Sequence, residues 1–214
     1  MSDAPTTEMH ATLADFLDRL AARTPTPGGG GAAALTGAVG CALAGMVANY
    51  SIGKRNAERS DGTKESLIQA ATLSLRRAGE MLRRLVDEDA AAYTELATAR
   101  RSFKANPAQA DAYQLAVHVA MSVPLEVAAV SAAALEAMDG IKGVASTPLL
   151  CDLGVAAQLT LAAARAASYC VRVNAAELND AAQRNAVLAQ LDTILVHAGE
   201  RAHSVATFVH GPSP

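Results

Sequence analysis

Tryptophan is absent from this chain of 214 residues, and aromatic residues make up only 3% of it. Side chains that suit β-strands are therefore sparse. Alanine, the best helix former, supplies 50 residues, and hydrophobic residues together supply 51%. So high an apolar content excludes a disordered chain. The composition predicts an all-α protein whose helices approach one another closely.

An excess of either charge is also lacking. Lys and Arg number 18 against 21 Asp and Glu, so the net charge of -3 gives no general reason to bind nucleic acid, and we expect no such partner. The three cysteines, Cys41, Cys151 and Cys170, have no metal-ligand spacing and are expected to be buried free thiols in a reducing cytosol. Because residues 1–7 are polar, no secretory signal is expected and a cytoplasmic location is predicted.

No charged residue occurs between Thr24 and Gly53, a stretch long enough to span a bilayer. Its apolar content is mostly alanine and glycine, which favour membrane insertion only weakly. We therefore expect a buried central helix and no membrane partner.

The apolar periodicity predicts a single domain over residues 1–214, an antiparallel bundle of about six helices with flexible ends at about 1–6 and 210–214. Thr6 or Thr7 is expected to cap the first helix, Gly28–Gly31 to form a turn, and Pro124 to kink the fourth helix. Alanine-rich faces often pack against another copy of the chain, so an oligomer is expected. The expected helices cover about 7–23, 32–51, 63–99, 107–138, 152–173 and 180–208.

One acidic residue, Asp89, lies on the apolar face predicted for the third helix. The inward positions, separated alternately by four and three residues, are Ala71, Leu75, Ala78, Leu82, Leu85, Asp89, Ala92 and Leu96. A carboxylate among core positions is costly unless it is paired or functional. Asp89 is therefore a candidate site residue.

A second acid, Asp152, stands at the predicted start of the fifth helix. It extends by one step an inward line that we place at Val155, Leu159, Ala162, Ala166 and Cys170. The pattern leaves two interpretations open, a helix cap and a second acid in the site. The line predicted for the last helix includes Ala186, Ile194 and Val205.

Several common chemistries are missing. Gly28–Gly31 is followed by Ala32 and Ala33 where a phosphate-binding loop needs Lys and Ser or Thr, and no strand precedes it. The five histidines have no close metal spacing, so no metal site is predicted. No serine elbow or Cys–His arrangement indicates a covalent nucleophile. What remains is a glycine turn, Lys54 and two acids, which suits acid–base or electrostatic handling of a small ligand.

An ordered set of motifs covers almost the whole chain and resembles the cyclodeaminase/cyclohydrolase family of folate enzymes. The matching pieces are Pro25–Ala34, Ile52-Gly53-Lys54, Asp87–Tyr93, Lys104, Val123-Pro124-Leu125, Asp152–Ala157 and Val173-Asn174-Ala175.

The resemblance implies a helical, dimeric enzyme that acts on tetrahydrofolate carrying a one-carbon unit. Family members either close 5-formiminotetrahydrofolate to 5,10-methenyltetrahydrofolate with loss of ammonia, or interconvert methenyl- and 10-formyltetrahydrofolate by adding water. Four glycines followed by three alanines are most similar to the stand-alone cyclohydrolases. Hydrolysis of the methenyl bridge is therefore expected, with the folate as substrate and no separate cofactor.

The resemblance also implies roles for particular residues. Asp89 would guide water or take its proton, Lys54 would pair with the glutamate tail or stabilise an oxyanion, and Asp152 would bind a pterin N–H. The glycines, which lack a Cβ atom, would let backbone N–H groups approach the ligand. The expected substrate-binding residues are Pro27, Gly28, Gly29, Gly30, Gly31, Tyr93, Lys104 and Asn174.

The chain departs from the family at several amide positions. Ser146 and Pro148 stand where the family has asparagines, Cys151 replaces a serine, and Cys170 replaces the first asparagine of the pair that ends at Asn174. These changes remove groups that would orient a pterin or a water. Three alternatives stay open: a formiminotetrahydrofolate cyclodeaminase, a cyclase or deaminase of this fold acting on a non-folate imine or amidine, and a non-catalytic helical scaffold.

Overall fold

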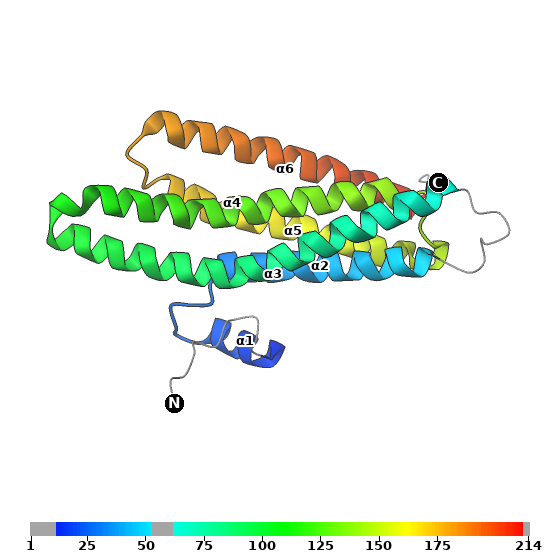
Figure 1. The fold of residues 1–214 in the computed structure, drawn as a ribbon, viewed down its shortest axis with the longest axis horizontal. Helices are drawn as coiled ribbons and strands as arrows, with labels where there is room; N and C mark the ends of the chain where they lie inside the picture. Colours follow the sequence, from blue (N-terminus) through cyan, green and yellow to red (C-terminus); the bar gives the residue numbers. More distant parts are fainter. Residues whose placement is uncertain (1–11, 53–61, 212–214) are drawn as a thin grey trace.

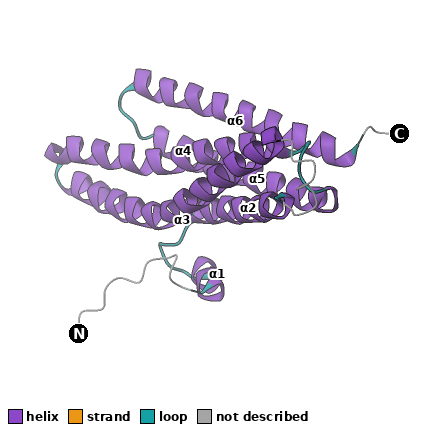
Figure 2. Cartoon of the chain, turned by 45° about the vertical axis from the view of Figure 1, so that its right-hand side comes forward, coloured by secondary structure: helices purple, strands orange, loops and turns teal. Residues whose placement is uncertain are grey.

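The computed structural model describes residues 12–52 and 62–211. Within these ranges the chain forms six α-helices, two short 3-10 turns and no strands (Figures 1 and 2), which confirms the all-α prediction. The helices are α1 (Leu13–Ala21), α2 (Gly29–Ser51), α3 (Gly62–Ala105), α4 (Ala110–Ile141), α5 (Leu150–Ala175) and α6 (Ala181–His210).

Helices α2 to α5 form the body of the bundle, in which α2 packs on α3 and α5 while α4 packs on the same two helices. Helix α6 covers α4 and α5, and the ribbon of α1 lies to one side of the other helices (Figures 1 and 2), with its Phe16 side chain buried in the core cluster. Glycines let α2 and α5 approach closely, since a Cβ atom on Gly40 would lie 2.3 Å from the Thr160 hydroxyl oxygen.

The apolar face predicted for α3 is confirmed. All seven apolar residues of the predicted line, from Ala71 to Leu96, are buried, whereas Asp89 at its place in that line is half-buried. Large leucines on one stripe and charged residues elsewhere give this helix a clear pattern.

The faces predicted for the last two helices are partly wrong. Helix α5 buries Leu153, Ala156 and Ala157, whereas Val155 is 47% exposed. Ala162 and Ala166 are also exposed, and Leu159 and Cys170 are half-buried. In α6, Val205 is buried, Ile194 is half-buried and Ala186 is exposed. Alanines on every side of these helices give too little contrast in size and polarity to mark the buried face.

Two helix starts differ from the prediction. The cap of α1 is Thr12, whose hydroxyl accepts from the Asp15 N–H while the Asp15 carboxylate accepts from the Thr12 N–H. Thr6 and Thr7 lie outside the described residues. Helix α2 begins at Gly29, so the last three residues of Gly28–Gly31 form its first turn and Gly28 is its cap. Packing against α3 compensates the low helix propensity of these glycines.

The helix containing Pro124 continues past it to Ile141. Proline has no N–H, so the Ala120 carbonyl loses the helical donor that position 124 would supply. The Asn174 side chain donates to this carbonyl instead, at 2.6 Å. A replacement hydrogen bond from α5 thus helps α4 to run through the proline.

Three helical stretches are long and apolar enough to cross a membrane by length and composition, namely Gly29–Ser51, Pro107–Ile141 and Thr147–Ala175. In the most apolar window of the first, 56% is buried against the rest of the chain. The expected central helix is therefore present, and the absence of a membrane partner stays a prediction.

Candidate functional site

A cavity of about 300 Å³ opens beside the first turn of α2, where α3, α4 and the last turns of α5 converge. Its walls combine glycine backbone, one carboxylate, two tyrosines, one thiol and one amide. The residues that line it are Pro25, Thr26, Gly28, Gly29, Gly30, Asp89, Ala92, Tyr93, Leu96, Ala120, Tyr169, Cys170, Val173 and Asn174.

The carboxylate of Asp89 lies against the first turn of α2. Its Oδ2 atom accepts from the Gly31 N–H at 2.8 Å, and this N–H belongs to the group that a helix start leaves without helical acceptors. A Cβ atom on Gly30 would lie 2.0 Å from Asp89 Oδ1, so only glycine leaves room for this carboxylate. The glycines at the start of α2 therefore leave room for the Asp89 carboxylate between α2 and α3.

Burial raises the pKa of Asp89, and the hydrogen bond from Gly31 only partly offsets this effect. A carboxylate with a raised pKa is a stronger base than an exposed aspartate. Asp89 Oδ1 accepts no hydrogen bond from the part of the chain that the structure describes. The site thus holds one oriented carboxylate with an oxygen free for a water or a ligand.

The thiol of Cys170 faces the same cavity from α5. Burial raises its pKa, and the negative charge of Asp89 raises it further. A Cβ atom on Gly29 would lie 3.8 Å from the Cys170 sulfur, an ordinary contact distance. Cys170 is therefore a neutral neighbour of Asp89 rather than an activated nucleophile.

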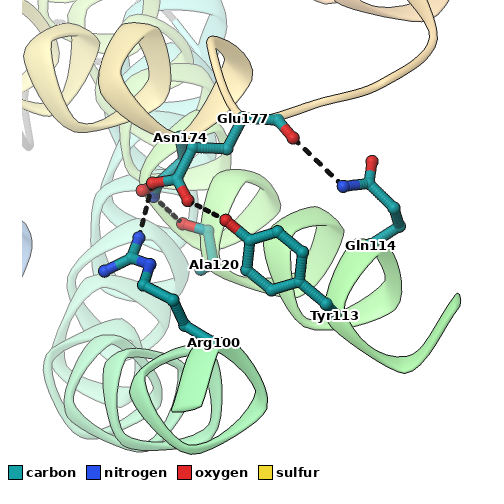
Figure 3. Close-up of polar contacts among 6 residues, drawn as sticks. All are labelled: Arg100, Tyr113, Gln114, Ala120, Asn174 and Glu177. Carbon is teal, nitrogen blue, oxygen red and sulfur yellow. Dashed lines mark hydrogen bonds and ion pairs between the residues drawn. The ribbon is translucent and has the colours of Figure 1, made fainter. Parts of the chain in front are cut away.

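A polar cluster ties the end of α5 to α3 and α4 next to the cavity (Figure 3). The Glu177 carboxylate accepts from Arg100 of α3 and from the Tyr113 hydroxyl of α4, and Gln114 donates to the Glu177 carbonyl at 3.1 Å. Burial alone would raise the pKa of Glu177, but the hydrogen bonds from Arg100 and Tyr113 outweigh it and hold that pKa below its usual value. The cluster fixes the segment that carries Asn174.

Comparison with known proteins identifies the family of this chain. The family model for formiminotransferase-cyclodeaminase matches residues 12–193. The chain belongs to this family. A methenyltetrahydrofolate cyclohydrolase from Methylorubrum extorquens is 32% identical over 192 residues, which cover 88% of this chain and 90% of the relative. The resemblance inferred from the motifs is therefore confirmed.

Two further relatives carry the cyclodeaminase name. A formimidoyltransferase-cyclodeaminase from Sus scrofa is 30% identical over 198 residues, which cover 91% of this chain and 36% of the relative. The crystal structure of formiminotetrahydrofolate cyclodeaminase from Thermotoga maritima superposes with a TM-score of 0.84 at 26% identity, over 94% of this chain and 96% of that chain.

Eleven residues are predicted for the site. Six of them are in the wall of the cavity, and a seventh contacts Asp89. Gly28, Gly29, Gly30, Asp89, Tyr93 and Asn174 line it, and Gly31 donates to Asp89. Pro27 is buried and follows a cis peptide bond from Thr26. Motifs far apart in the sequence therefore meet at one place.

Two predicted residues, Asp152 and Lys104, are not brought together with these, and a third lies outside the described residues. Asp152 lies in the first turn of α5, and the 18 residues to Cys170 correspond to about 27 Å of helix. It is also not the helix cap, because α5 begins at Leu150, after the 3-10 turn at Pro148. Lys104 is exposed at the far end of α3, and Lys54 lies outside the described residues.

The departures from the family motif fall at both ends of α5. Near Asp152, Ser146 donates its N–H to the Ser51 hydroxyl at 2.9 Å. The burial expected for Cys151 is wrong, because its thiol is exposed in the first turn of α5. Cys170 alone of the replaced positions lines the cavity. The residues predicted for the site did not include Thr26, Val173, Tyr169 or the Glu177 cluster. Thr26 and Val173 lie inside the family motifs, whereas no sequence pattern indicated Tyr169 or the cluster.

Proposed function

We propose that this protein hydrolyses 5,10-methenyltetrahydrofolate to 10-formyltetrahydrofolate, with the folate as substrate and no separate cofactor. The observation that carries the proposal is Asp89, a half-buried carboxylate of raised pKa in a cavity built from the family's glycine and asparagine motifs. The Methylorubrum relative named for this activity supports the choice among the family's reactions.

In the proposed reaction a water is held between Asp89 Oδ1 and the methenyl carbon. The carboxylate takes a proton as the water oxygen bonds to that carbon. The bond from the carbon to N5 then breaks as its electron pair returns to N5, which takes up one proton, while the hydroxyl proton leaves as the formyl C=O forms. The formyl group stays on N10, and one proton is released overall. Because the methenyl group is cationic, the negative charge of Asp89 also favours its binding in a cavity that excludes part of the solvent.

The remaining lining residues suit a flat heteroaromatic ligand. Tyr93 and Tyr169 offer ring faces for stacking, and the first turn of α2 offers backbone N–H groups next to Asp89. The Asn174 side-chain nitrogen donates to the Ala120 carbonyl, and within the described part of the chain its amide oxygen accepts no hydrogen bond and can accept one from a ligand. These groups would orient the pterin ring with its reactive carbon near Asp89.

Cyclodeamination of 5-formiminotetrahydrofolate is the second candidate, favoured by the names of the Sus scrofa and Thermotoga relatives. It involves the same one-carbon centre and a general acid–base group at the same place. Cys170 in the cavity, where the family has an asparagine, favours the further alternative of a non-folate imine or amidine.

We also propose that the enzyme is a cytoplasmic homodimer. The outward side of α5 carries large apolar groups, with Val155 47%, Tyr169 73% and Val173 65% exposed in the single chain. A second copy would cover Val155 and leave Tyr169 and Val173, which line the Asp89 cavity, open to the ligand. Sedimentation of the purified protein at micromolar concentration tests this directly, and a monomer at all concentrations would contradict it.

Loss of methenyltetrahydrofolate absorbance, measured against a blank without enzyme, tests the proposed activity. A parallel assay follows ammonia released from 5-formiminotetrahydrofolate. Acceleration in the first assay alone supports the cyclohydrolase, and ammonia release alone supports the cyclodeaminase. No acceleration in either assay would reject a folate reaction and direct attention to other imines.

A further inference from the structure

A second cavity is separate from the site. It is an open groove of about 680 Å³ between the second half of α2 and the first half of α3. Small residues make the space, since Ala42 and Gly45 on α2 face Gly79 on α3. A Cβ atom on Gly45 would meet nothing within 4 Å.

The charge on the groove walls has one sign. Among the described residues that line it, Arg76 and Arg83 alone are charged, and the α2 wall is neutral because Gly29–Ser51 contains no charged residue. Asn49 and Tyr50 add an amide and a phenol at one end. The whole chain has a net charge of -3, so a local pair of cations is not a general property of its surface.

The two guanidinium groups share one side of α3. A separation of seven residues is close to two helical turns and places their Cα atoms about 10 Å apart along the axis. Arg76 approaches Glu80 at 3.9 Å, with side chains 67% and 54% exposed, a pair too solvated to compete strongly with a bound anion. Each guanidinium can bind a carboxylate or phosphate through paired hydrogen bonds.

We propose that this groove binds a linear polyanion whose acidic groups engage Arg76 and Arg83 and whose body lies along Ala42 and Gly45. The ligand class is an extended chain with at least two carboxylates or phosphates about 10 Å apart. Asn49 and Tyr50 supply polar contacts at the end nearer the C-terminus of α2. The proposal is independent of the reaction assigned to the Asp89 cavity, because binding here requires no turnover.

Calorimetry with triglutamate peptide and with inorganic tripolyphosphate tests the proposal and separates carboxylate from phosphate ligands. Wild type is expected to bind one equivalent of at least one probe, more weakly at 200 mM than at 25 mM NaCl. Arg76→Gln and Arg83→Gln should each weaken binding at least tenfold. The matched control Arg101→Gln, on the same helix outside the groove, should leave binding unchanged.

A second variant keeps both arginines and fills the space. Gly45→Leu places a side chain in the empty part of the groove and should weaken binding at least tenfold while circular dichroism shows an intact helical fold. No binding by wild type, equal loss with Arg101→Gln, or full binding by Gly45→Leu would overturn the proposal. A shift of Gly45→Leu from dimer to monomer in sedimentation would also overturn it, since a second copy would then occupy the groove.

Discussion

The Asn174 side chain donates to the Ala120 carbonyl at 2.6 Å, and this carbonyl is the one that Pro124 leaves without its helical donor. Two family motifs, one in the middle of α4 and one at the end of α5, are therefore linked by a single hydrogen bond. The bond holds Asn174 at the wall of the cavity that contains Asp89.

Asn174→Ala should lower the free energy of unfolding by about 1 kcal/mol, because the partly buried Ala120 carbonyl loses its donor. Adding Pro124→Ala restores a helical N–H at position 124 and should recover part of that loss. Denaturant unfolding of the two single variants and the double variant measures the coupling. Strict additivity would contradict the link between Pro124 and Asn174.

The contact between Gly30 and Asp89 makes a second prediction. Gly30→Ala would place a methyl group 2.0 Å from Asp89 Oδ1, so the carboxylate must move. The turnover of the proposed substrate should fall at least tenfold, and the unfolding free energy should fall by about 1–3 kcal/mol.

Gly45→Ala is the matched control in the same helix, because a Cβ atom there meets nothing within 4 Å. It should raise stability by about 0.5–1 kcal/mol through helix propensity alone and leave turnover unchanged. Wild-type activity in Gly30→Ala would show that the position of Asp89 does not matter to the reaction.

Glu177→Gln tests the cluster at the end of α5. The pKa of Glu177 is lower in the folded than in the unfolded chain. The ionised carboxylate therefore adds to the free energy of unfolding above the unfolded pKa of about 4.3, and this addition is lost as pH falls through the folded pKa. The variant should be less stable than wild type by about 1 kcal/mol at pH 7, and the difference should shrink below about pH 4.

Asp192→Asn is the control for that experiment. Asp192 pairs with Arg172 at 2.6 Å, but their side chains are 61% and 47% exposed, so the change in stability should be near zero. A pH-independent difference for Glu177→Gln would mean that packing, and not the charge of Glu177, holds the end of α5.

Cys170→Asn returns the family's amide to the cavity beside Asp89. If the substrate is a folate, the added donor and acceptor should lower KM for methenyltetrahydrofolate several-fold with little change in kcat. Steady-state kinetics of the variant measure the effect. Cys41→Ala is the control, because the buried thiol of Cys41 lies outside this cavity. A large loss of kcat/KM in Cys170→Asn would favour a substrate that the thiol has been selected to fit.

Sequence reasoning reached the fold and the central carboxylate because α3 carries a sharp pattern. Leucines at Leu75, Leu82, Leu85 and Leu96 define one stripe, and a charged residue within it stands out. The same reasoning failed on α5, where alanines occur on every side and Val155 is exposed. A small side chain fits a buried or an exposed position almost equally well, so periodicity carries little information there.

The details of the site required three-dimensional contacts. Gly31 and Asp89 are 58 residues apart, and Glu177 lies 77 residues from Arg100, so no local pattern reports either contact. The low helix propensity of glycine predicts a turn at Gly28–Gly31. The packing that makes Gly29–Gly31 helical cannot be read from the sequence. Asp152 and Asp89 each lie in a family motif, but Asp152 is in the first turn of α5, whereas Asp89 lies beside the last turns of that helix.

The stability of Asp89→Asn follows from the pKa of Asp89. Burial raises that pKa in the folded chain, so the ionised carboxylate lowers stability at every pH above its unfolded pKa of about 3.9. Removing the charge should leave the free energy of unfolding at pH 7 equal to or higher than that of wild type. A loss of activity in this variant would then not come from unfolding.

The rate of methenyltetrahydrofolate hydrolysis by wild type and by Asp89→Asn, each corrected for the uncatalysed rate, tests the central claim most directly. The account predicts clear catalysis by wild type and a fall in kcat of about 10²–10⁴ in the variant, without loss of stability. Wild-type kcat in a folded Asp89→Asn protein would contradict the assignment of Asp89 as the general base.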